Sequence, residues 1–121
     1  MEELHFTTRV LGPAASYRLE LRQVTQTLRS ESDSIANAVL LGRVSAGDRL
    51  EVLLDSRLVG NVELVSMDAV NWEALVIDDA RRGGFGNRFE LAYALQRAGY
   101  RFMPLAKYEF YRIQFRWLEE A

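Results

Sequence analysis

The sequence Arg-Gln-Val-Thr-Gln-Thr-Leu-Arg, residues 22–29, decides the fold that we expect for this chain. Polar and apolar side chains alternate along it, and successive side chains of an extended strand point to opposite faces. Thr25, Thr27 and Arg29 would therefore share one face. Two hydroxyls and a guanidinium can together bind a flat polar ligand or an anion. The alternative is an edge strand whose polar face is only solvated, and the stretch by itself favours that alternative.

The composition predicts one soluble globular domain over residues 1–121. Hydrophobic residues make up 49% and charged residues 26% of the 121 positions, which is ordinary for such a domain. Cysteine is absent and His5 is the single histidine, so we expect no disulfide, no metal site and no cofactor. Residues 1–9 lack a signal-peptide pattern, and no apolar run has membrane-spanning length. We therefore expect a cytoplasmic protein without a membrane partner.

The charge argues against a protein that holds long nucleic acid mainly through phosphates. The net charge is −2, whereas such proteins are usually basic. An RNA would need a local patch, and residues 81–88, Arg-Arg-Gly-Gly-Phe-Gly-Asn-Arg, form the densest basic stretch. It could hold a phosphate backbone and stack a base on Phe85. Alternatively, the two arginines complement a helix end and the glycines terminate that helix.

Most of the predicted elements are strands, and two longer helices precede the last strand. By periodicity and turn signals we expect strands at 4–11, 49–54, 58–67 and 108–118, and helices at 14–21, 72–82 and 88–98. A short apolar segment at 35–41 follows a polar loop in which Asp33 or Ser34 can act as the N-cap. This order predicts an α+β, mainly β, domain: a small curled sheet or barrel with helices at one side.

Three smaller patterns add structural expectations. Gly60 leaves a gap on one face of its strand, which predicts the close approach of another element. In the last strand, the face with Ile113 and Phe115 is expected in the core, and the face with Phe110 is expected to be wet. Adjacent Asp78 and Asp79 do not face each other on a helix, so we interpret them as solvated or paired with Arg81 and Arg82.

Three pieces in order resemble the ASCH family of PUA-like domains. Residues 25–29, Thr-Gln-Thr-Leu-Arg, resemble the end of that family's Gly-x-Lys-Thr-x-Thr-hydrophobic-Arg signature. Residues 47–50, Gly-Asp-Arg-Leu, are similar to the turn that opens its third strand, and residues 110–115 resemble its closing strand. The resemblance covers nearly the whole chain. It implies a PUA-like β-barrel of five or six strands with two to three helices at one side.

The resemblance also implies a ligand. In this family the cleft beside the Thr-x-Thr-x-Arg strand is thought to bind RNA, a nucleotide or a modified base. We therefore expect an RNA or a nucleoside-type small molecule as the partner, bound without catalysis. The candidate ligand-binding residues are Thr25, Gln26, Thr27, Arg29, Arg81, Arg82, Arg88, Lys107 and Tyr108.

Two alternatives stay open. Some bacterial relatives are acetylcytidine amidohydrolases in which the signature Lys, the second Thr and a later Glu form the catalytic set. Here Thr27 matches that Thr, but Val24 holds the Lys position, and the region expected to supply the Glu reads Arg81-Arg82-Gly83-Gly84. A proton-transfer partner is thus missing nearby, and Thr27 would be catalytic only if such a partner had moved elsewhere. The second alternative is a protein-interaction module that uses aromatic surfaces.

Overall fold

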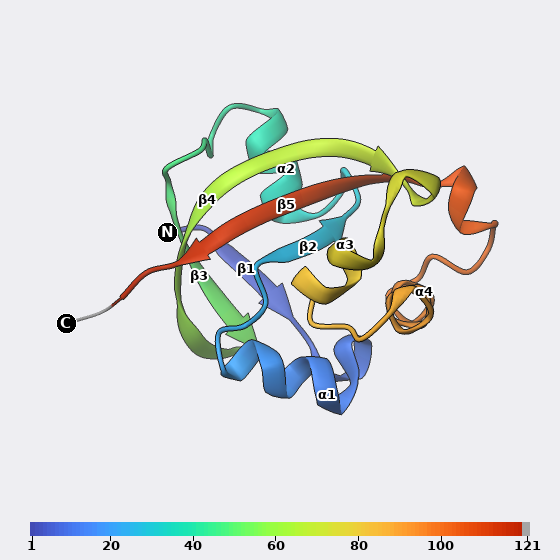
Figure 1. The fold of residues 1–121 in the computed structure, drawn as a ribbon. Coiled ribbons are helices and arrows are strands. Elements are labelled where there is room, and N and C mark those ends of the chain that lie inside the picture. The colour runs from blue at the N-terminus through green and yellow to red at the C-terminus, as the bar shows by residue number, and fades with distance from the viewer. Residues whose placement is uncertain (120–121) are drawn as a thin grey trace.

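Five strands form one curled sheet in the computed structural model, which describes residues 1–119 (Figure 1). Their order across the sheet is β1-β3-β4-β5-β2. β1 lies parallel to β3, and the other neighbouring strands are antiparallel. The strands are β1 (Glu3–Phe6), β2 (Gln26–Arg29), β3 (Arg49–Leu54), β4 (Arg57–Asn71) and β5 (Glu109–Trp117).

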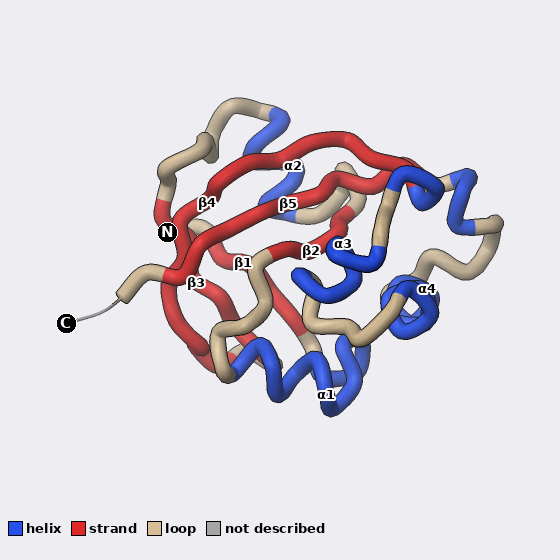
Figure 2. The backbone as a smooth tube through the Cα atoms, viewed as in Figure 1, coloured by secondary structure: helices blue, strands red, loops and turns tan. Residues whose placement is uncertain are grey.

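The helices cover the sheet unevenly, as Figures 1 and 2 show. α1, α3 and α4 lie together at one side, whereas α2 lies across the opposite side of the curl. Their bounds are α1 (Thr8–Glu20), α2 (Ser34–Leu40), α3 (Ile77–Arg82) and α4 (Arg88–Arg97), with short 3-10 helices η1 (Trp72–Ala74) and η2 (Leu105–Lys107). The expected mainly β barrel with helices at one side is confirmed. Within residues 1–119, no helix has the length and apolar character needed to cross a membrane.

The β3–β4 hairpin is confirmed, and its turn follows from its residues. Asp55 and Ser56 both have positive φ, 50° and 68°, as the two central residues of a primed hairpin turn do. β4 extends four residues beyond the expected end at Met67. The gap at Gly60 is filled by Arg22, whose Nη2 would lie 3.0 Å from a Cβ at that position. The predicted close approach is therefore also confirmed.

The expected first strand is wrong beyond Phe6. The Thr7 side chain accepts a hydrogen bond from the Val10 amide and begins α1 as its N-cap. Gly12 has φ +79°, so the helix kinks there, and Pro13 follows with the fixed φ that suits the start of a helical segment. Gly12-Pro13 therefore marks a kink within α1 and not the end of a strand.

The expected helix at 72–82 is divided. The Asn71 side chain accepts from the Ala74 amide, but the 3-10 turn that it caps ends after Ala74. Leu75 is buried in an extended conformation, and α3 begins at Ile77. The second predicted helix and its Asn87 cap are confirmed.

Both faces of β5 contribute to the core. Ile113 and Phe115 are buried as expected, but Phe110 is fully buried on the face that was expected to be wet. The ring of Tyr100 lies 4.8 Å from that of Phe110, between centroids, and the Tyr108 ring lies 6.2 Å away. Aromatic residues that follow α4 therefore cover this face of the strand.

One buried carboxylate attaches α3 to the sheet. Asp79 is only 3% exposed. Its Oδ1 accepts from Gln26 Nε2 on β2 at 2.9 Å and from Arg112 Nη1 on β5 at 3.1 Å. Its Oδ2 accepts from the Val76 amide at 2.9 Å, as an acidic residue at the third position of a helix does. Arg112 also forms an ion pair with Asp68 on β4.

The hydrogen bonds of Asp79 determine its protonation. Burial alone would raise the pKa of this carboxyl, but the bonds from Val76, Gln26 and Arg112 outweigh burial and hold the pKa below its ordinary value. Asp79 is therefore ionised at neutral pH. Its interpretation as a solvated residue or a partner of Arg81 and Arg82 was wrong.

We predict that Asp79→Asn lowers the free energy of unfolding by about 1–3 kcal/mol at pH 7, because an amide nitrogen cannot accept the Val76 or Arg112 hydrogen bonds. The matched control is Asp78→Asn, an exposed carboxyl one position earlier, which should change little. Because the pKa of Asp79 is lower in the folded protein, its stabilisation is complete above the unfolded value of about 3.9. The difference between wild type and Asp79→Asn should therefore shrink as the pH falls below about 4. Urea unfolding at several pH values measures this, and equal stability of the two variants would contradict the assignment.

Candidate functional site

A cavity of about 370 Å³ lies where β1, α1, β2 and α4 meet. Such a volume is at the small end of ligand pockets and suits a single small molecule. The exposed lining residues, which mark its open end, are His5, Thr7, Arg9, Ser32 and Ala98. The buried lining residues include Phe6, Leu11, Gln26, Asp79, Phe85, Ala94, Leu91 and Leu95. The cavity thus runs from a polar, exposed end to a buried end between sheet and helices.

The buried end combines an apolar wall with two polar side chains. Phe85, Leu91 and Leu95 supply the wall from α4 and the segment before it. Gln26 and Asp79 supply the polar groups and are hydrogen-bonded to each other. A few fixed polar groups in an apolar cavity are what orients a small ligand.

Toward the open end, Arg29 joins elements that are far apart in the sequence. Its Nε donates to Thr27 Oγ1 at 3.1 Å, its Nη1 to Asp33 at 2.8 Å and its Nη2 to the carbonyl of His5 at 2.7 Å. The guanidinium carbon also lies 4.8 Å from the centre of the Phe6 ring. β1 and β2 are the two edges of the sheet, so Arg29 bridges the open seam of the curl.

Two further polar side chains lie beside Arg29. Asp33 accepts from the Ile35 and Ala36 amides with its second oxygen and so caps α2 as predicted. Burial raises the pKa of the Tyr100 hydroxyl, which therefore stays neutral and able to donate or accept. The open end thus offers an ion pair and a neutral hydroxyl.

The surroundings of Thr27 contain no base for nucleophilic catalysis. Its hydroxyl accepts from Arg29, and no carboxylate or imidazole in the described part of the chain is hydrogen-bonded to it. Val24, at the position of the signature Lys, is fully buried. Gly84 approaches it so closely that a Cβ there would lie 2.9 Å from Val24 Cγ2. The double glycine after α3 therefore permits close packing against the segment before β2.

The structure brings together only part of the predicted ligand-binding set. Gln26, Thr27 and Arg29 line the cavity. Thr25 is not among its lining residues, and the backbone of Thr25 bonds to Arg82 and Phe115. Lys107 and Tyr108 line a second hollow of about 330 Å³.

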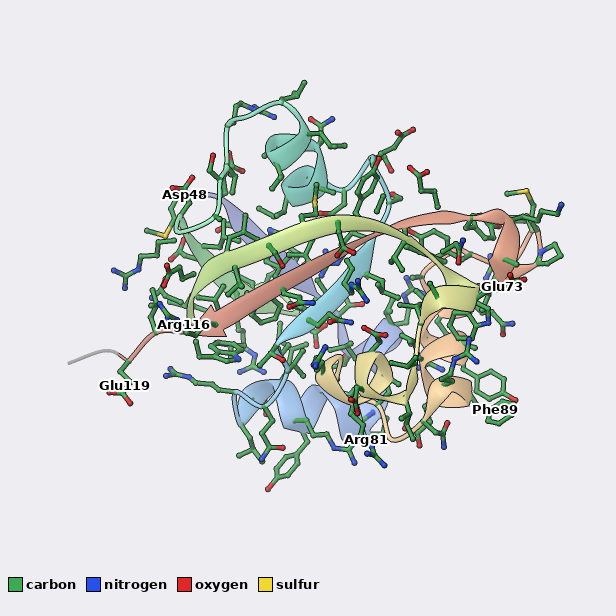
Figure 3. All side chains as sticks on the ribbon, turned by 45° about the horizontal axis from the view of Figure 1, so that its top comes forward. Asp48, Glu73, Arg81, Phe89, Arg116 and Glu119 are labelled. Carbon is green, nitrogen blue, oxygen red and sulfur yellow. The ribbon has the colours of Figure 1, made fainter. Side chains whose placement is uncertain are left out.

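The three predicted arginines of the basic stretch lie outside both hollows. Arg88 donates to the Trp72 carbonyl at 3.0 Å, and its guanidinium carbon lies 4.6 Å from the centre of the Trp72 ring. Arg81 and Arg82 are exposed at the end of α3. Figure 3 shows Arg81 on this side of the molecule, far from Asp48 at the opposite end of the sheet. A role for these residues in binding stays a prediction.

Sequence reasoning missed several residues that line the cavity. Asp79, Leu91, Leu95 and Tyr100 were not candidates, although all four line it. For Asp79 a local signal exists, because it stands at the third position of α3 next to buried Ala80. Tyr100 carries no such signal, since it becomes part of the site only when the chain after α4 returns to the sheet.

We predict that Arg29→Lys lowers the free energy of unfolding by about 1–2 kcal/mol, because one ammonium group cannot reach all three acceptors in the fixed geometry of a guanidinium. The matched control is Arg57→Lys, since Arg57 is exposed and its pair with Glu20 is also exposed. Thermal unfolding of both variants measures the effect. If Arg29→Lys melts like the control, Arg29 does not hold the seam and is free to bind a ligand instead.

Comparison with known proteins indicates the type of fold. No family model and no curated protein matches this sequence. A crystal structure of a protein from Enterococcus faecalis V583, assigned to the family model DUF984, aligns with a TM-score of 0.67 and 12% identity over 98% of this chain and 80% of its own. A crystal structure of an ASCH domain from Lactobacillus crispatus JV V101 aligns with a TM-score of 0.55 and 16% identity over 86% of this chain and 69% of its own. The chain therefore has an ASCH-like fold of the PUA type.

Proposed function

We propose that this domain binds a nucleoside or nucleotide in the cavity beside β2 and does not transform it chemically. The observation that carries the proposal is one cavity of about 370 Å³ that joins a buried polar pair, Gln26 and Asp79, to an exposed polar end. A planar base fits between the apolar wall and the polar pair, with its sugar or phosphate toward Arg9 and Arg29. The ASCH-like fold supports this assignment by analogy.

An RNA would use the same cavity with one nucleotide. Proteins recognise single-stranded RNA by taking up unstacked bases, and a cavity of this size accepts one base and its sugar. The exposed arginines of α3, Arg81 and Arg82, would then contact phosphates of the same strand without reading its sequence. A free nucleoside and a nucleotide within RNA thus present the same chemistry to the cavity.

Binding without catalysis is supported by the state of the titratable groups. Asp33 is held by Arg29 and two backbone amides, and Asp79 accepts three hydrogen bonds. General acid–base catalysis needs a titratable group within reach of the reacting atoms, with a pKa near the working pH. The pKa of Asp79 is held low, which makes it a poor base.

We predict that Ala98→Trp reduces nucleoside affinity by about tenfold or more, because a large ring at this exposed lining position fills the open end of the cavity. The control is Gln96→Trp, which places the same ring on an exposed position near the end of α4 that does not line the cavity. Calorimetric titration with the four common ribonucleosides and their 5′-monophosphates measures affinity, and melting temperature verifies folding. If both tryptophan variants bind like wild type, the ligand lies elsewhere.

We predict that the protein does not deacetylate N4-acetylcytidine, because Thr27 has no adjacent base and Val24 cannot carry a proton. Chromatography of the nucleoside after incubation with the purified protein detects cytidine if it forms. Clear turnover that disappears in Thr27→Ala would show that the domain is an amidohydrolase after all.

A further inference from the structure

The side chain of Gln26 has a fixed orientation and a free oxygen. It is 1% exposed, and its Nε2 donates to Asp79 Oδ1 at 2.9 Å. Because an ionised carboxylate only accepts hydrogen bonds, Asp79 holds the nitrogen of the amide toward itself. The other end of the amide, Oε1, is buried and accepts no hydrogen bond from residues 1–119.

A buried acceptor without a donor costs free energy, so such groups usually have a partner. Two other buried polar atoms in the described chain lack a partner, Ser16 Oγ and Arg88 Nε, but neither residue lines the cavity. Gln26 does line it. The free oxygen is therefore a feature of the cavity that a bound molecule can satisfy.

The neighbouring groups at the buried end define what that molecule must supply. Phe85, Leu91 and Leu95 donate nothing, and Asp79 is an acceptor. The charge of Asp79 is balanced by Arg112, so the ligand does not need to bring a positive charge. A neutral, planar N–H donor meets these conditions.

We propose that Gln26 Oε1 accepts a hydrogen bond from an N–H group on the base edge of the bound nucleoside. The proposal rests on the proposed function and names its recognition chemistry: an exocyclic amino group or a ring N–H is required at the buried end of the cavity. Asp79 acts as a positioning residue, because it fixes which end of the Gln26 amide faces the ligand.

Matched nucleosides that differ only in this donor test the proposal. Cytidine is compared with N4,N4-dimethylcytidine, adenosine with N6,N6-dimethyladenosine, and uridine with 3-methyluridine. Calorimetric titration of the wild-type protein should show about tenfold weaker binding of the methylated member of the pair that the cavity accepts. The same pair is then measured with Gln26→Met, which keeps the length of the side chain and removes its acceptor.

The variant separates a lost hydrogen bond from a steric clash of the added methyl groups. If the hydrogen bond is made to Oε1, the preference for the unmethylated nucleoside should largely disappear in Gln26→Met and persist in the control Gln23→Met, an exposed glutamine outside the cavity. A preference that persists in a folded Gln26→Met protein overturns the proposal. Equal wild-type binding of both members also overturns it and would mean that a water molecule satisfies Oε1. If no nucleoside binds at all, the proposed function itself fails.

Discussion

The buried carboxylate of Asp79 is the interaction on which the arrangement of this domain depends. It accepts from β2, from β5 and from the first turn of α3, so it places the helix against the sheet. An unpaired carboxylate at this depth would be strongly unfavourable, but three donors and the charge of Arg112 compensate its burial. The same contacts hold the Gln26 amide in one orientation. The group that attaches α3 to the sheet thus also determines the chemistry of the cavity.

Much of the fold could be predicted because its signals are local. The β3–β4 hairpin follows from alternation and a two-residue turn, and α4 follows from its Asn87 cap. The misread segments are those in which tertiary contacts overrule local preference. Residues 7–11 look like a continuing strand until Thr7 caps a helix, and Phe110 looks solvated until the chain after α4 covers it. No local pattern reports either contact.

The site was predictable in part for the same reason. Alternation placed Thr27 and Arg29 on one strand face, and both line the cavity. It could not show that Arg29 bridges to the His5 carbonyl across the open seam of the sheet, because that contact joins the two edge strands. It also could not distinguish Asp79 from its exposed neighbour Asp78, since only the position of α3 against Gln26 and Arg112 separates them. Pairing between distant segments determines the site more than any motif does.

The central claim is that the cavity beside β2 receives the base of a nucleoside at Gln26. The most direct measurement is a two-dimensional ¹⁵N–¹H NMR titration of the labelled protein with the nucleoside that binds most tightly. The account predicts the largest shifts for the side-chain amide of Gln26 and for the backbone amides of Phe85, Leu91 and Leu95, with little change on the outer face of α4, where Figure 3 shows Phe89 pointing away from the molecule. Shifts confined to Lys107, Tyr108 and their neighbours, with an unchanged Gln26 amide, would contradict it.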